Sequence, residues 1–78
     1  MRESRKLTHL EVDKITFSIT SLDQEQRQLV RQHIYDILAR TNGLIYKESF
    51  HRELEKLRHD NTISEIDLHG IEHAFLEE

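Results

Sequence analysis

The chain has 78 residues and a formal net charge of −4 at pH 7, with no cysteine, no proline and two glycines. A chain this short can form only one small domain, and the absence of cysteine excludes disulfides, thiol nucleophiles and zinc ribbons. The N-terminal stretch is charged and no apolar run approaches ~20 residues, so we expect a cytoplasmic protein without a signal peptide or a membrane span.

The N-terminal segment is predicted to begin with a frayed tail over residues 1–6, which are mostly polar. Thr8 and Glu11 have the spacing of a capping box, in which each side chain bonds the backbone N–H of the other residue, so they indicate the start of a helix. Residues 14–20 also alternate apolar and polar side chains, as strands do, and this alternative stays open.

If this first segment is a helix, Val12, Ile15 and Ile19 share the face that turns toward the core. Leu10 and Phe17 then lie on the opposite face and form an exposed apolar strip. Such a strip needs a cover, so we expect either self-association as a homodimer or the docking of a protein partner.

A second, longer helix is predicted from about Leu22 to Thr41. Ser21 and Gln24 have the spacing of a capping box at its start, and Asn42-Gly43 fits a left-handed C-cap at its end. Apolar side chains recur at helical spacing between these ends and form a wide stripe, which predicts contacts with several other elements. The stripe consists of Leu29, Val30, Ile34, Ile37 and Leu38.

The C-terminal half is predicted to form two further helices. The third spans about Lys47 to Asp60, and Ser64 caps a fourth that runs toward the C-terminus. The β-like connectors Leu44-Ile45 and Thr62-Ile63, on either side of the third helix, could form a small two-stranded contact. The fold class is therefore all-α: the whole chain forms one small, compact bundle of three to four short helices joined by tight turns.

His69, Glu72 and His73 spell H-x-x-E-H, the pattern of a zinc-binding helix in one class of metalloprotease. A helix advances about 100° per residue, which turns both histidines away from the apolar Ile71 and Phe75. The two histidines are therefore expected on a solvent-facing side of the helix rather than in a cleft.

A catalytic zinc site also needs a third protein ligand, for which only His51, Glu55 or His59 would come into question. These three share a face of the third helix that also points away from its apolar residues. We therefore expect no enzyme and no cofactor. His69 and His73 remain as an alternative metal-binding or pH-responsive pair.

Charge is unevenly distributed along the chain. Residues 1–40 carry seven Lys/Arg and six Asp/Glu, whereas residues 41–78 carry four and nine. The third and fourth helices could be drawn as a helix-turn-helix, but the fourth has no Lys or Arg to meet phosphates. We therefore expect no nucleic-acid partner.

The sequence favours a non-enzymatic protein–protein interaction module of a regulatory kind. Its partner-binding residues would be Glu72, Glu77 and Glu78 on an acidic fourth helix, together with Leu10 and Phe17 on the first segment. The last two glutamates stand at a helix C-terminus, where the helix dipole disfavours carboxylates, so they have no evident role in the fold. A further alternative is an acidic inhibitor that occupies a basic or nucleic-acid-binding site on a partner protein.

Overall fold

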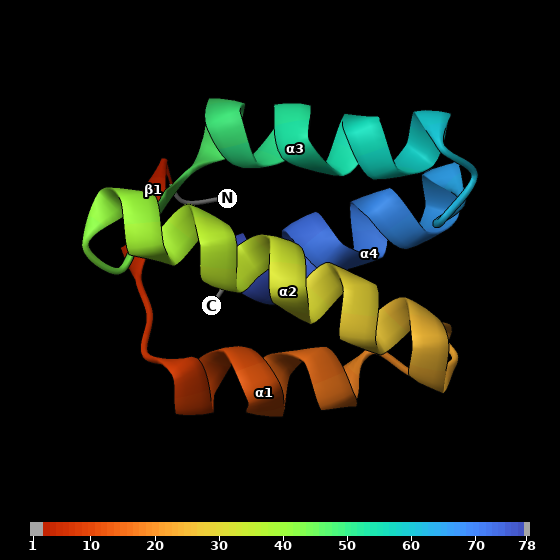
Figure 1. The fold of residues 1–78 in the computed structure, drawn as a ribbon, viewed down its shortest axis with the longest axis horizontal. Helices are drawn as coiled ribbons and strands as arrows, with labels where there is room; N and C mark the ends of the chain where they lie inside the picture. Colours follow the sequence, from red (N-terminus) through yellow and green to blue (C-terminus); the bar gives the residue numbers. More distant parts are fainter. Residues whose placement is uncertain (1–2, 78) are drawn as a thin grey trace.

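Four helices and two short strands make up residues 3–77, the part of the chain that the computed structural model describes (Figure 1). In chain order they are β1 (Ser4–Lys6), α1 (His9–Ser18), α2 (Gln24–Thr41), β2 (Leu44–Tyr46), α3 (Lys47–His59) and α4 (Glu65–Leu76). The expected helices are confirmed, but the expectation of an all-α chain is incomplete because a small two-stranded sheet is present. No helix in the described residues is long and apolar enough to cross a bilayer.

The sheet joins the start of the chain to the connector between α2 and α3, so residues 3–6 are not the frayed tail that their polarity suggested. β1 and β2 run antiparallel, with Arg5 opposite Ile45. The Leu7 amide donates to the Gly43 carbonyl at 2.8 Å, which extends the pairing. Leu7, which directly follows β1, and Ile45 of β2 are buried, so the core anchors this polar segment on both sides of the sheet. The remainder of the predicted tail lies outside the described residues.

The strand pairing that the sequence suggested for Thr62-Ile63 is wrong, because β2 pairs with β1 instead. The Thr62 amide donates to the Leu57 carbonyl at 2.9 Å, and the Thr62 carbonyl accepts from the Gln26 side chain at 3.0 Å. The polar backbone groups of this turn are therefore satisfied by α3 and α2, and no second strand is needed.

Residues 14–18 continue α1, which settles the open choice between helix and strand for most of that stretch. The predicted capping box of Thr8 and Glu11 is present. Thr16, one of the polar residues in the alternating pattern, is buried, and its hydroxyl donates to the Val12 carbonyl at 2.6 Å. This bond within the helix allows a β-branched polar side chain to face the core.

The start of α2 differs from the prediction by two residues. Asp23, rather than Ser21, is the N-cap, and it forms a capping box with Gln26. The Ser21 hydroxyl instead donates to Asp67 of α4 at 2.8 Å. At the other end the predicted C-cap is confirmed, because Asn42 takes the left-handed conformation with φ 56°.

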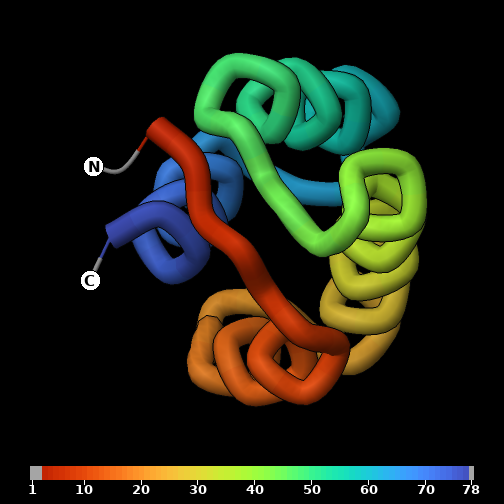
Figure 2. The backbone as a smooth tube through the Cα atoms, turned by 90° about the vertical axis from the view of Figure 1, so that its left-hand side faces the viewer, coloured from red at the N-terminus to blue at the C-terminus, as the bar shows by residue number. Residues whose placement is uncertain are grey.

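The core lies between α2 and α4, with α1 and α3 closing its two sides (Figure 1). Seen from the left of that view, β1 and β2 cross one end of the bundle (Figure 2). Phe50 of α3 meets Phe75 of α4 edge to face, with ring centroids 5.7 Å apart. Six positions of α4 are buried, namely Asp67, Leu68, Ile71, Glu72, Phe75 and Leu76. This helix is buried over a wide arc because it contacts both α1 and α3.

Candidate interaction surface

Leu10 and Phe17 lie on the surface of α1, as the helical pattern predicted, and each side chain is 64% exposed. They are seven residues apart, so they project from the same side of the helix about 10.5 Å apart along its axis. The exposed Lys14 stands between them. The three side chains form one stripe, in which the aliphatic stem of the lysine can extend the apolar contact area.

A groove of about 310 Å³ runs beside Phe17, between α1 and the first half of α2. Its lining residues are Phe17, Gln24, Arg27, Gln28 and Arg31, and we call it the α1–α2 groove. The Arg27 guanidinium lies over the Phe17 ring at 5.7 Å from its centroid. This cation–π contact fixes an aromatic wall that is both apolar and bordered by positive charge.

A second hollow, of about 440 Å³, lies on the other side of Gln24 and Gln28. Leu29, which is partly exposed, and Glu25 line it with the same two glutamines. The α1–α2 groove and this hollow therefore form one continuous surface over the first half of α2, with an apolar side chain at each end.

Next to the groove, α1 is tied to α2 by a small polar cluster. The Tyr35 hydroxyl donates to the Asp13 carboxylate, which also lies 3.7 Å from Arg31 Nε. Burial raises the pKa of Tyr35, and the hydrogen bond to Asp13 raises it further, so the phenol remains a donor. The His9 ring stacks on Tyr35 with centroids 4.4 Å apart. This cluster holds the two helices that form the groove in a fixed relation.

The acidic face predicted on α4 is not a continuous surface. Glu72 is only 7% exposed, and its Oε1 lies 2.6 Å from His51 Nδ1 on α3. Glu77 Oε2 lies 3.2 Å from His73 Nδ1, one helical turn back. Glu78 lies outside the described residues. Glu72 is therefore not part of an exposed acidic face, because its carboxylate joins α4 to α3.

The histidine pair of the H-x-x-E-H pattern lies on the exposed side of α4, as predicted. Within residues 3–77, no group of three His, Cys, Asp or Glu side chains is arranged to hold a metal ion. Of the third ligands considered, His51 is engaged with Glu72, and Glu55 accepts two hydrogen bonds from Arg58 at 3.0 and 3.1 Å. The structure does not bring either of them to His69 and His73.

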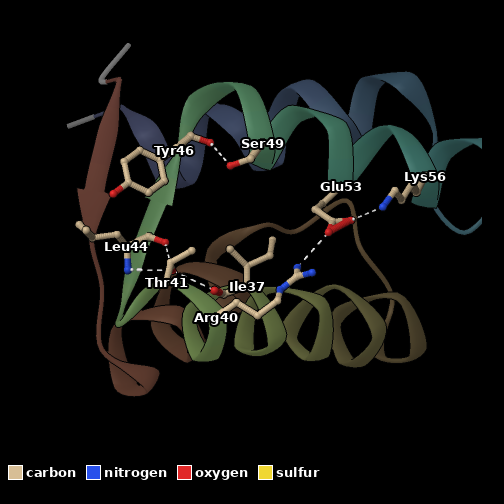
Figure 3. A network of polar contacts seen from close by, with 8 residues as sticks. All are labelled: Ile37, Arg40, Thr41, Leu44, Tyr46, Ser49, Glu53 and Lys56. Carbon is tan, nitrogen blue, oxygen red and sulfur yellow. Dashed lines mark hydrogen bonds and ion pairs between the residues drawn. The ribbon is translucent and has the colours of Figure 1, made fainter.

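A polar network connects α2 to α3 on another side of the molecule (Figure 3). Glu53 of α3 accepts a hydrogen bond from Arg40 of α2 at 3.0 Å and lies 3.2 Å from Lys56. The hydrogen bond from Arg40 holds the pKa of Glu53 below its usual range, and Lys56 acts in the same direction. These contacts pair Arg40, Glu53 and Lys56 within the groove between α2 and α3, so we assign them to the fold rather than to a binding site.

The polar side of the groove was not predicted from the sequence. Arg27, Gln28 and Arg31 were outside the apolar stripe of α2 and received no role. Their spacing, with Gln24, is i, i+3, i+4 and i+7, which places them on one helical face. The missing information was the position of α1, since only the packing of α1 against α2 brings Phe17 to this polar face.

The fold and this surface define a small four-helix protein with a two-stranded sheet and an exposed apolar and basic face on α1 and α2. No family model, no curated protein and no solved structure matches the chain.

Proposed function

We propose that the protein is a non-enzymatic interaction module that docks a protein partner on the face formed by α1 and the first half of α2. The observation that supports this most is the pair Leu10 and Phe17, each 64% exposed on one side of a capped, core-anchored helix. Burying such a side chain is worth about 1.5–3 kcal/mol, so a fold that leaves two of them in water forgoes a large stabilisation.

The composition of the groove supports the same proposal. Aromatic residues and arginine are enriched where protein interfaces concentrate their binding energy, and Phe17 lies here in contact with Arg27. Among residues 3–77, Ile66 on α4 is even more exposed, at 80%, but it lines none of the grooves described above. A single exposed apolar side chain is common on any protein surface, so Ile66 serves better as a control.

The test is a quantitative capture experiment from the native cell with three baits: the unaltered chain, the double variant Leu10→Ser/Phe17→Ser, and the control Ile66→Ser. We expect one or more proteins to be captured by the unaltered chain and by the control, and to be lost with the double variant. Circular dichroism should show the same helical content in all three, because all substituted side chains are exposed. A capture profile that is identical for all three baits would contradict the proposal.

A further inference from the structure

The charge around Phe17 is opposite in sign to that of the whole chain. The chain carries a net charge of −4. Arg27 and Arg31 line the groove, and the exposed Lys14 lies next to Phe17 on α1. Against these three cations stand two carboxylates: Asp13, which already accepts a hydrogen bond from Tyr35, and Glu25 in the adjacent hollow. The local surface is therefore basic, and it attracts an acidic partner.

The two groove arginines keep most of their hydrogen-bonding capacity. Arg27 makes one long bond, from Nη2 to the Ile19 carbonyl at 3.5 Å. Arg31 lies 3.7 Å from Asp13 without a hydrogen bond to it. The Nε atoms of both arginines are buried without any acceptor. A guanidinium has five N–H donors in a planar fork that fits a carboxylate. Because both Nε atoms are buried, the donors left for a partner are those of the terminal amino groups of these two partly exposed side chains.

From this groove we infer that the partner presents an acidic amphipathic helix, a deduction that rests on the proposed function. The apolar stripe of such a helix would pack on Leu10 and Phe17, whose spacing of about 10.5 Å matches the i to i+7 repeat of a second helix lying along α1. Its flanking Asp or Glu side chains would reach Arg27 and Arg31. The interaction combines a buried apolar centre with charge-assisted bonds at its border.

A second copy of this chain fits the same face less well. In a two-fold symmetric contact the face would meet itself, which brings Lys14, Arg27 and Arg31 of both copies together. The chain's own acidic helix offers a poor substitute, because Asp67 and Glu72 are buried and Glu77 is paired with His73, which leaves Glu65 as the exposed carboxylate of α4. An acidic helix from another protein avoids this repulsion.

The experiment is a selection from a displayed library of helical peptides. Each peptide has leucine at i, i+3, i+4 and i+7, and each remaining position is randomised among Glu, Lys, Gln and Ala. We expect the peptides that bind the unaltered chain to be enriched in Glu over Lys. The tightest one is then synthesised, and its dissociation constant is measured by fluorescence anisotropy at low and high salt.

Three variants test whether the peptide binds in the α1–α2 groove. Arg27→Gln/Arg31→Gln and the exposed charge reversal Lys14→Glu should each weaken binding, the double variant by about tenfold at low salt and less at high salt. Phe17→Ser should abolish it. The matched control Arg52→Gln/Lys56→Gln, which removes two cations from the α2–α3 groove, should leave the affinity unchanged.

Several outcomes would overturn the inference: no enriched peptide, enriched peptides that are neutral or basic, or an affinity that none of the cation variants changes. Sedimentation of the unaltered chain and of Phe17→Ser tests whether a second copy of the chain occupies the face. A dimer that dissociates in the Phe17→Ser variant would assign the face to a second copy. If Phe17→Ser removes binding while the cation variants do not, the docking face stands and only the acidic occupant fails.

Discussion

At the scale of single residues, Glu72 shows how a charged side chain can belong to the core. Its carboxylate is nearly covered by protein and lies 2.6 Å from His51 Nδ1, so it joins α4 to α3. One helical turn earlier, Leu68 is buried as well. At about 100° per residue the two positions are only about 40° apart on the helix. Glu72 is therefore on the buried side of α4.

We predict that Glu72→Lys destabilises the protein, because it places an unpaired cation at a buried site beside His51. The expected loss is about 3 kcal/mol in the free energy of unfolding, measured by urea denaturation followed by circular dichroism. The control is His69→Lys on the exposed side of the same helix, for which the change should stay within about 0.5 kcal/mol. Equal stability of the two variants would place Glu72 at the surface after all.

Glu53 provides the second residue-scale prediction, which concerns pH. The hydrogen bond from Arg40 lowers the folded-state pKa of Glu53 below that of the unfolded chain. A lowered carboxyl pKa contributes stability above the unfolded-state pKa, and this contribution is lost as pH falls through the lowered folded-state value. Glu53→Gln should therefore cost about 0.5–1 kcal/mol at pH 7.

The difference between the unaltered chain and Glu53→Gln should narrow as the solution is acidified below the ordinary range of Glu. The measurement is urea denaturation of both proteins from neutral to acidic pH. A gap that stays constant across the whole series would mean that the Arg40 contact does not act through the charge of this carboxylate.

At the scale of elements, the helices were predictable because their signals are local. Thr8 with Glu11, and Ser64 with Asp67, form capping boxes, as their spacing in the sequence indicates. The sheet was not predictable in the same way. β1 contains Ser, Arg and Lys, so it shows no apolar alternation, and its pairing depends on contacts made 40 residues further along the chain.

The same distinction applies to the candidate site. The exposure of Leu10 and Phe17 followed from the helical period alone. The position of Arg27 beside Phe17 depends on the packing of two helices and could not be derived from either helix by itself.

At the scale of elements, replacing each of the two glycines by alanine should change the stability of the protein in opposite directions. Gly70 lies on the exposed side of α4, and a Cβ added there would meet nothing within 4 Å. Gly70→Ala should therefore stabilise the protein by about 0.5–1 kcal/mol through helix propensity. Gly43 follows the C-cap of α2 with φ +89°, a conformation that alanine rarely adopts, so Gly43→Ala should destabilise it. Thermal melts of both variants check the signs, and a stabilising Gly43→Ala would contradict this account of the turn.

At the scale of the whole molecule, the helices differ in how much of each is buried in the core. α4 is used mainly to fill the core: Asp67 and Glu72 are buried, and Glu77 at its C-cap is paired with His73, whereas Glu65 in the first turn is exposed. α1 covers the core with one side only, which leaves Leu10 and Phe17 outside. The packing of α1 on α2 then adds two arginines to the exposed apolar strip. We therefore propose the N-terminal half of the chain, rather than the acidic C-terminal helix, as the surface that docks a partner.

The most direct test of this claim is a two-dimensional NMR titration of the isotope-labelled chain with the partner recovered by the capture experiment. We predict that the backbone amide signals that move most belong to residues 10–31, in α1 and the first half of α2. The exposed side of α4, marked by Ile66 and His69, should change little. The largest shifts on α4, with residues 10–31 unaffected, would contradict the account.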